Sequence, residues 1–151
     1  MDNNYDLLKD VIQWDIKTWS QTLIFWEENF KIHPKMSALI LGERDGGLSL
    51  WFALKNVEVT CSDIKSFSKN TFELHKKYSV NSKIKYQEGL DMTNLSQFPA
   101  NHFDIISFKS VIGALSTKEQ QQKAIDEMKR ILKPEGAILF AENLEASLIH
   151  R

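Results

Sequence analysis

The stretch "SALILGERDGG", residues 37–47, combines two patterns that together decide the fold. Its first part, residues 37–42, is a continuous apolar run, which is typical of a strand in a parallel sheet that is covered on both faces. Its second part is a turn in which Gly42, Gly46 and Gly47 supply three of the six glycines of the chain. Glycines there allow a tight bend and bring backbone N–H groups close to a ligand. A following helix start adds partial positive charge. The stretch therefore predicts a strand, a ligand-binding turn and a helix.

Outward from this stretch, strand patterns and helix patterns alternate along the chain. The expected strands cover 57–63, 83–89, 103–109 and 137–143, and the expected helices cover 48–55, 66–78, 116–132 and the start of one more at 144–151. Ser116 and Glu119 form a capping-box pair, and the sequence KPEG is a turn before the fifth strand. This alternation predicts an α/β fold: a doubly wound, mostly parallel sheet of about five strands, flanked by helices.

Residues 1–33 form a helical extension ahead of the sheet. Apolar residues recur there at spacings of three and four from Leu8 to Phe30, and Pro34 ends the pattern. The pattern fits one long helix or two helices with a bend. The three tryptophans of this extension either pack into the core or form a lid over a ligand or a subunit contact; they are Trp14, Trp19 and Trp26.

The composition bounds the function. A chain of 151 residues with 42% hydrophobic residues has the size of one domain. Its 19 basic and 20 acidic residues give a net charge of −1, which provides no electrostatic reason to expect a nucleic acid partner.

Cys61 lies in an apolar run and indicates a buried thiol. The four histidines lack the spacing of metal ligands, so no metal site is expected. The chain has no apolar run of about 18 residues and an acidic, polar start, which favours a cytoplasmic protein without a membrane span.

Two further acidic residues follow predicted strands. Asp63 ends the second strand, 21 residues after Gly42, and an acid at about that distance can accept hydrogen bonds from ribose hydroxyls. Asp91, in "EGLDMTNL" (88–95), can accept a hydrogen bond from an exocyclic amine, and Met92 can lie flat against a ring. Ligands of such sheets bind outside the carboxyl ends of the strands, where these residues would meet. The alternatives are a tight turn, an aspartate that caps the next helix, and a polar loop.

In this order the motifs resemble those of class I S-adenosylmethionine-dependent methyltransferases. "LILGERDGGLSL" resembles the glycine-rich first motif, "CSDI" the second-strand acid that holds the ribose, and "EGLDMTNL" the loop that recognises adenine. "NHFDIISFKSVIGAL" looks like the fourth-strand motif that faces the methionine part of the cofactor, and "MKRILKPEGAILFAEN" is similar to the family's helix, turn and fifth strand. The resemblance covers residues 37–143 and implies a single Rossmann-like cofactor-binding domain at 34–151.

The resemblance also implies a function and a set of site residues. The cofactor would be S-adenosylmethionine, with S-adenosylhomocysteine as the product, and the acceptor a small molecule or a saccharide. It names no catalytic residue, and Trp14, Trp19 and the N-terminal helix are candidates for a lid over the acceptor. The implied cofactor-binding residues are Gly42, Glu43, Arg44, Gly46, Asp63, Ile64, Asp91, Met92 and Lys109.

Two departures from the family pattern bear on these expectations. The family has an acid before the first glycine, where this chain has Ile40, and a middle glycine, where it has Arg44. Either the cofactor binds in a changed geometry, with Glu43 or Asp45 near its ammonium and Arg44 near its carboxylate, or its affinity is reduced or lost. The family's sheet has seven strands and this chain has room for five. We therefore expect a domain shortened at its C-terminus, a natural fragment, or a homo-oligomer that covers the edge of the fifth strand.

Two other functions stay open. A non-catalytic module that keeps the methyltransferase fold is favoured by the altered first motif and the missing strands. A nicotinamide-dependent oxidoreductase would share the glycine turn and Asp63. It is disfavoured by Arg44, by the lack of a second substrate domain and by the LKPEG turn.

Overall fold

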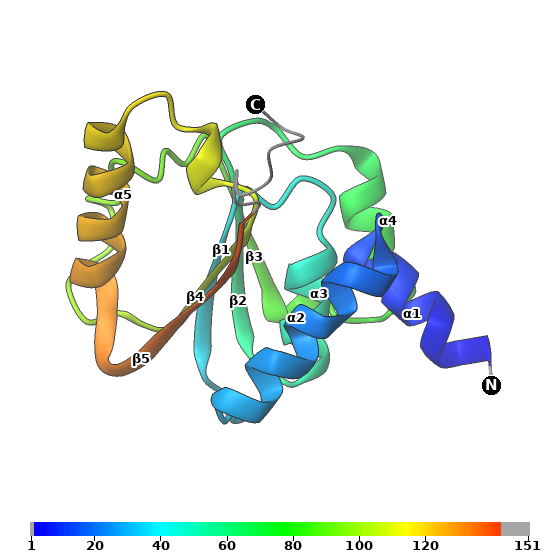
Figure 1. The fold of residues 1–151 in the computed structure, drawn as a ribbon. Helices are drawn as coiled ribbons and strands as arrows, with labels where there is room; N and C mark the ends of the chain where they lie inside the picture. Colours follow the sequence, from blue (N-terminus) through cyan, green and yellow to red (C-terminus); the bar gives the residue numbers. More distant parts are fainter. Residues whose placement is uncertain (1, 143–151) are drawn as a thin grey trace.

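The computed structural model describes residues 2–142, which form helices, strands and two short 3₁₀ helices in regular alternation (Figure 1). Their order is α1 (Asp2–Ile12), α2 (Ile16–Asn29), β1 (Ser37–Leu41), α3 (Gly47–Leu54), β2 (Glu58–Asp63), α4 (Lys69–Lys77), η1 (Asn81–Lys83), β3 (Ile84–Glu88), β4 (Phe103–Lys109), η2 (Ile112–Ala114), α5 (Lys118–Ile131) and β5 (Leu132–Ala141). The last residue of the predicted fifth strand and the helix expected at 144–151 lie outside the described residues.

The five strands form one sheet in the order β3-β2-β1-β4-β5, and every pairing is parallel. The α/β prediction is therefore confirmed. β1 pairs with β2 on one side and with β4 on the other, so the strand order reverses at β1. The carboxyl ends of the strands point toward the top of Figure 1. Sheets of this kind bind ligands at that edge, next to the reversal.

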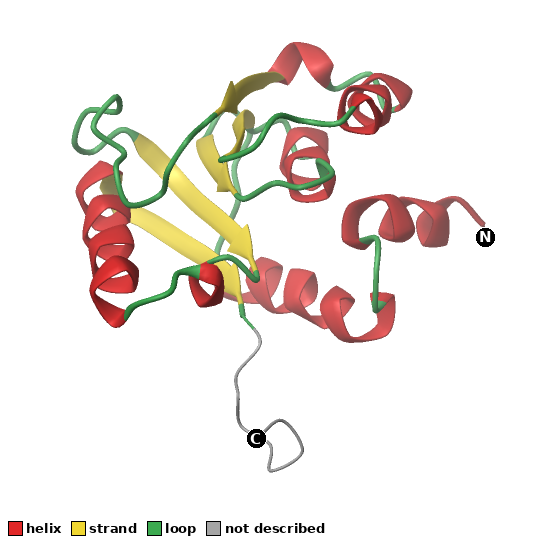
Figure 2. Ribbon diagram, turned by 90° about the horizontal axis from the view of Figure 1, so that it is seen from above, coloured by secondary structure: helices red, strands yellow, loops and turns green. Residues whose placement is uncertain are grey.

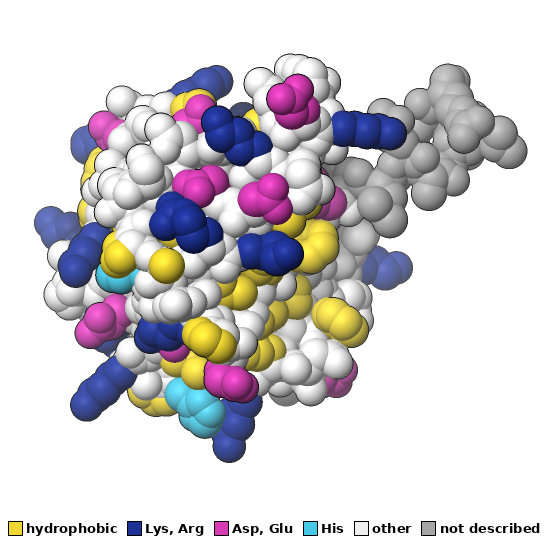
Figure 3. Space-filling model, turned by 90° about the vertical axis from the view of Figure 1, so that its left-hand side faces the viewer, with side chains coloured by type: hydrophobic (Ala, Val, Ile, Leu, Met, Phe, Trp, Pro, Cys, Tyr) yellow, Lys and Arg dark blue, Asp and Glu magenta, His cyan; other side chains and the backbone are white. Residues whose placement is uncertain are grey.

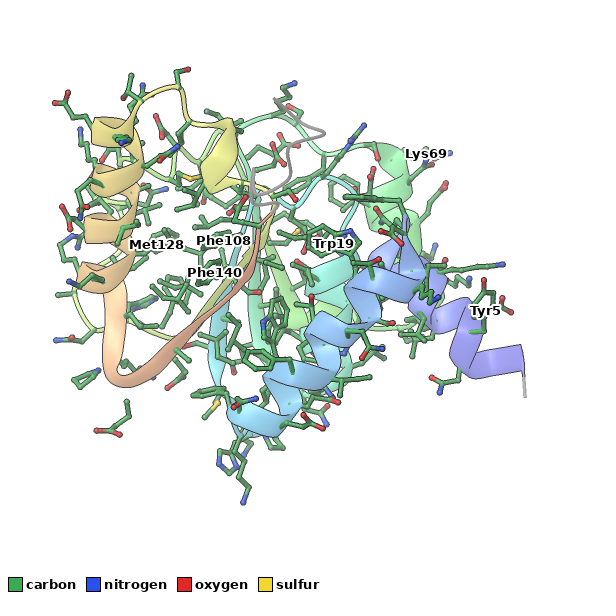
Figure 4. All side chains as sticks on the ribbon, viewed as in Figure 1. Tyr5, Trp19, Lys69, Phe108, Met128 and Phe140 are labelled. Atoms are coloured by element: carbon green, nitrogen blue, oxygen red, sulfur yellow. The ribbon has the colours of Figure 1, made fainter. Side chains whose placement is uncertain are left out.

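Helices cover both faces of the sheet, as the view from above shows (Figure 2). Ala38 and Ile40 of β1 belong to the core on the side of α1–α3, whereas Leu39 and Leu41 belong to the core on the side of α5. All four are buried, which explains the continuous apolar run in the sequence. Met128 and Phe108 both belong to the core between α5 and the sheet (Figure 4). Cys61 is fully buried in the other layer, as its apolar surroundings in the sequence predicted.

Helix α5 begins one residue later than its expected capping box. The N-cap is Thr117, whose side chain accepts a hydrogen bond from the backbone N–H of Gln120 at 3.1 Å, so the predicted pairing of Ser116 with Glu119 is wrong. Three buried residues of α5 recur at helical spacing and face the core between this helix and the sheet. They are Ala124, Met128 and Ile131.

The N-terminal extension consists of two helices. The break carries positive φ values at Gln13 (71°) and Asp15 (44°), which no right-handed helix accommodates. Trp19 and Trp26 of α2 are buried, so for these two residues the core-packing alternative is correct. Trp14 lies in the break and is 50% exposed. In residues 2–142 no helix is long and apolar enough to cross a membrane.

Strand β5 includes the expected KPEG turn as a bulge. Phe103 pairs with Leu132 and Ile105 pairs with Ala137, so residues 133–136 face a single residue of β4. β5 is one edge of the sheet in the described part of the chain, and Phe140 on it is 54% exposed. Figure 3, which views the α5 and β5 side, shows hydrophobic side chains among the charged ones. Coverage of this edge by a second copy stays a prediction.

Candidate functional site

The site lies where the loop after β1 meets the segment after β4. Gly42 has a φ of +61°, and a Cβ atom on it would lie 2.6 Å from Cγ2 of Val111. Such a distance is closer than atoms can approach, and the conformation itself disfavours other residues. Glycine at position 42 thus lets two loops from opposite sides of the switch point touch.

Two cavities adjoin at Gly42, and both are lined by Leu41, Gly42 and Ser110. The first cavity has a volume of about 250 Å³ and carries the charged groups of the loop; its other lining residues are Val11, Gln13, Trp14, Glu43, Arg44, Asp45, Gly47, Leu48 and Lys109. The second has a volume of about 320 Å³ and is mostly apolar; its other lining residues are Ile64, Leu90, Asp91, Met92, Val111, Ala114 and Leu115. Together they offer a charged half and an apolar half to one elongated ligand.

Glu43 is turned inward and caps the start of α3. It is 6% exposed, and its carboxylate accepts hydrogen bonds from the N–H groups of Leu48 (3.1 Å) and Ser49 (2.5 Å) and from the Ser49 hydroxyl (2.6 Å). Burial raises the pKa of Glu43, and the three donors oppose this by favouring the ionised form. We expected the backbone N–H groups at the start of α3 to attract a negative charge of the ligand. Two of them instead donate to the protein's own carboxylate.

Arg44 lies at the outer rim of the first cavity. Its side chain is 93% exposed, and its Nε atom is 3.8 Å from Oδ2 of Asp45. An ion pair of this exposure contributes little to stability. Arg44 and Asp45 therefore present a positive and a negative group side by side at the mouth of the cavity.

Lys109 connects the end of β4 to the break between α1 and α2. Its Nζ atom donates a hydrogen bond to the carbonyl oxygen of Ile12 at 3.0 Å. The same atom lies 5.6 and 5.3 Å from the ring centroids of Trp14 and Trp19, which pack edge to face on each other. Burial lowers the pKa of Lys109, and the charges of Glu43 and Asp45 oppose this shift. The lysine thus holds the α1–α2 break beside the first cavity.

The segment after β4 contains groups that the sequence did not point to. Ser110 has a φ of +55° and lines both cavities, and its N–H donates to the carbonyl oxygen of Ala141 at 2.8 Å. The carboxylate of Glu142 accepts hydrogen bonds from the N–H groups of Val111 and Ile112, each at 2.7 Å. A serine in the left-handed region has no sequence signal. Glu142 is 30 positions from Ile112, the nearer of its two partners in sequence, and 31 from Val111.

Of the predicted site residues not yet placed, Gly46 lines neither cavity, and the others lie on or near the second one. Ile64 and Met92 line it. Asp91 also lines it, and its Oδ1 atom accepts hydrogen bonds from the N–H and the hydroxyl of Thr93, each at 2.8 Å. Asp63 lines neither cavity, and its Oδ1 accepts a hydrogen bond from the N–H of Lys65 at 2.8 Å. Its carbonyl accepts a hydrogen bond from Leu90, which joins the loops after β2 and β3.

The sequence profile described as a methyltransferase domain matches residues 39–140, which is well over half of the chain. The chain belongs to this family. It is thereby a class I, S-adenosylmethionine-dependent methyltransferase domain with a Rossmann-like sheet. The matched segment runs from β1 into β5, so the two N-terminal helices lie outside it. The comparison with curated proteins gave no match.

Solved structures resemble this methyltransferase domain in fold. YcgJ of Bacillus subtilis is 22% identical with a TM-score of 0.68, covering 80% of this chain and 50% of that one. The [4+2]-cyclase SpnF is 19% identical with a TM-score of 0.65, covering 79% and 42%. Phosphoethanolamine N-methyltransferase 2 of Haemonchus contortus, in complex with phosphomonomethylethanolamine and S-adenosylhomocysteine, is 20% identical with a TM-score of 0.64, covering 81% and 28%. This chain thus spans half or less of the length of these three chains, and one of them is named for a reaction other than methyl transfer.

Proposed function

We propose that this domain binds S-adenosylmethionine across the two cavities and serves methyl transfer to a small-molecule or saccharide acceptor. The observation that carries the proposal is the meeting of a charged and an apolar cavity at Gly42, where the sheet order reverses. A zwitterionic amino-acid end suits the first cavity, and a flat base suits the second. The steric demand at Gly42 supports the same conclusion, because it keeps the two cavities adjoining.

The residues present fit such a cofactor in both halves. In the first cavity, Asp45 and Lys109 offer a negative and a positive group for an ammonium and a carboxylate, and Arg44 offers a second positive group at the rim. In the second cavity, Met92 and the apolar side chains beside it suit the faces of a purine. The Asp91 carboxylate is placed for an exocyclic amine, and we assign the ribose hydroxyls to Asp63, next to Ile64 of the cavity wall.

In the reaction, the protein mainly orients the cofactor and the acceptor and excludes water. When bound, the cofactor would supply a sulfonium methyl group, whose carbon the acceptor nucleophile would attack in line with the carbon–sulfur bond, with S-adenosylhomocysteine as the leaving group. Trp14, held by Lys109, lines the first cavity and would restrict water there. Trp14 and the α1–α2 break are our candidates for a wall of the acceptor site. The phosphomonomethylethanolamine named with the Haemonchus enzyme supports a small-molecule acceptor for this fold.

Calorimetric titration with S-adenosylhomocysteine tests the cofactor assignment. We expect saturable binding, and no detectable heat at millimolar ligand would contradict the proposal. Replacing Asp63 with Ala should weaken binding by about 1.5–3 kcal/mol, because charge-assisted hydrogen bonds to the ribose are lost. The matched control is Asp126→Ala on α5, whose carboxylate accepts a hydrogen bond from Gln122 far from both cavities.

A second candidate is a binding module of the same fold without catalysis. It is favoured by Glu43, whose carboxylate already uses the donors at the start of α3. S-adenosylhomocysteine binding without turnover on a broad panel of acceptors would support the module. A thermal shift with NADH but not with S-adenosylhomocysteine would instead favour an oxidoreductase.

A further inference from the structure

His75 is a fully buried side chain of α4 that lies directly behind the loop between β1 and α3. Its Nε2 atom is 2.8 Å from the carbonyl oxygen of Gly46, and its Nδ1 atom is 2.8 Å from the hydroxyl of Tyr86 on β3. The rings of His75 and Tyr86 are stacked with centroids 5.7 Å apart. Both ring nitrogens are thus engaged by groups from other elements of the fold.

These two partners fix the position of the proton on the ring. A carbonyl oxygen can only accept, so Nε2 carries the hydrogen and donates it to Gly46. Burial lowers the pKa of His75, which favours the neutral ring, and Nδ1 then accepts the hydrogen of the Tyr86 hydroxyl. Burial raises the pKa of Tyr86 to about 12, so its hydroxyl keeps that hydrogen. The imidazole is therefore held in one tautomer and one orientation.

The carbonyl that His75 holds belongs to the residue that starts α3. Gly46 is the N-cap of this helix with a φ of +86°, and its carbonyl also accepts the first helical hydrogen bond, from Leu50 at 3.0 Å. A Cβ atom at position 46 would lie 2.7 Å from Nε2 of His75. Because Glu43 is fixed by Leu48 and Ser49, the segment from 43 to 46 is anchored at both of its ends.

We propose that His75 is a positioning residue for the first cavity. Through Gly46 it holds residues 43–46 in the shape that receives the amino-acid end of S-adenosylmethionine, an inference that rests on the proposed function. Arg44 and Asp45, which lie between the two anchors, line this cavity. Of the loop 42–47, the second cavity is lined by Gly42 alone. Loss of His75 should therefore affect one half of the ligand and spare the other.

Two substitutions separate the hydrogen bonds of His75 from its packing. His75→Leu introduces an apolar side chain of similar size and removes both hydrogen bonds. His75→Gln keeps one donor and one acceptor at a similar separation. Calorimetry would compare S-adenosylhomocysteine, which fills both halves, with 5′-methylthioadenosine, which lacks the amino-acid end.

We expect His75→Leu to weaken S-adenosylhomocysteine binding about tenfold and 5′-methylthioadenosine binding by no more than about twofold, since the hydrogen bond that holds the Gly46 carbonyl is lost. His75→Gln should recover most of the lost affinity. Equal effects of His75→Leu on both ligands, or no effect on either, would overturn the positioning role. The proposed function would still stand in that case, provided that the wild-type chain binds S-adenosylhomocysteine. Failure of the wild-type chain to bind S-adenosylhomocysteine would overturn both.

Two measurements apply even where His75→Leu does not fold. Tyr86→Phe removes only the hydroxyl that orients Nδ1, and it should weaken S-adenosylhomocysteine but not 5′-methylthioadenosine. Nitrogen NMR of the wild-type imidazole should report a neutral ring with hydrogen on Nε2 at neutral pH. Unchanged affinity in Tyr86→Phe, or hydrogen on Nδ1, would contradict the proposed arrangement.

Discussion

Glu43 accepts hydrogen bonds from both the backbone N–H and the hydroxyl of Ser49, at 2.5 and 2.6 Å, and both residues are buried. A loop carboxylate thereby caps a helix whose formal N-cap, Gly46, has no side chain to do so. The interaction explains why an acidic residue stands directly after Gly42. Its first role is to build the loop.

Replacing Glu43 with Gln should destabilise the fold. The amide offers one acceptor oxygen to three donors, so buried N–H groups at the start of α3 lose their partner. We expect the free energy of unfolding to fall by about 1–3 kcal/mol in urea denaturation. Ser49→Ala is the control, because it removes only the hydroxyl bond and should cost about 1 kcal/mol or less. A larger loss in Ser49→Ala than in Glu43→Gln would contradict the capping role.

Gly42→Ala should impair cofactor binding for a steric reason that can be isolated. Gly42 and Gly89 have similar φ values of +61° and +68°, but a Cβ atom would clash with Val111 only at position 42 and would meet no atom within 4 Å at position 89. Both substitutions carry the backbone cost of about 1 kcal/mol, whereas only Gly42→Ala forces the two loops apart.

We expect S-adenosylhomocysteine affinity to fall at least about tenfold in Gly42→Ala and to stay near wild type in Gly89→Ala, because lining groups displaced by even a small distance lose their hydrogen bonds. The double variant Gly42→Ala/Val111→Ala should regain part of the affinity. Equal affinities in the two single variants would show that the contact with Val111 is unimportant.

The sheet could be predicted from the sequence because its signals are local. The run from Ala38 to Leu41 is buried on both faces, and the alternation of strands and helices determines the parallel pairing. The glycine turn likewise indicated that a ligand site lies at the carboxyl ends of the strands, where the two cavities are. These features depend on residues that are neighbours in the chain.

The parts that escaped prediction depend on contacts between distant segments. His75 and Gly46 are 29 positions apart and meet only after the βαβ unit has formed. The break between α1 and α2 contains neither glycine nor proline, so neither residue type marks the positive φ at Asp15 in the sequence. The capping of α3 by Glu43 also escaped prediction, because its hydrogen bonds to this helix have no sequence pattern of their own.

Asp104→Asn should change how stability depends on pH. The Asp104 carboxylate accepts hydrogen bonds from the N–H of Ser37 at 2.8 Å and from Lys133 at 3.0 Å, which ties the starts of β1, β4 and β5 together. Burial alone would raise the pKa of Asp104, but the hydrogen bonds from Ser37 and Lys133 outweigh it and lower the pKa. The unfolded chain therefore binds this proton more readily than the folded chain.

The contribution of Asp104 is consequently full above about pH 4, the pKa of an unperturbed aspartate, and is lost as the pH falls through the lowered pKa of the folded chain. At neutral pH we expect Asp104→Asn to reduce the free energy of unfolding by about 1.5–3 kcal/mol. In urea denaturation, the difference between wild type and variant should shrink as the pH falls below about 4, because the folded carboxyl gains its proton only below the pKa of an unperturbed aspartate. A difference that stays constant across this range would contradict the lowered pKa.

Lys109→Met should release the α1–α2 break from the end of β4. Methionine keeps the apolar length of the side chain but removes the hydrogen bond to Ile12 and the cation over the Trp14 and Trp19 rings. Together these contacts of a charged donor are worth about 1.5–3 kcal/mol, so amide hydrogen exchange in residues 9–16 should accelerate about tenfold or more. Lys55→Met is the matched control, because Lys55 also lies over a tryptophan ring, with its Nζ atom 4.6 Å from the ring centroid of Trp51. It pairs with Glu27 and lines neither cavity. Lys55→Met should leave exchange in residues 9–16 unchanged. Equal exchange in the two variants would mean that the break is held by packing of α2 on the sheet, and Trp14 would then not depend on Lys109 for its place at the first cavity.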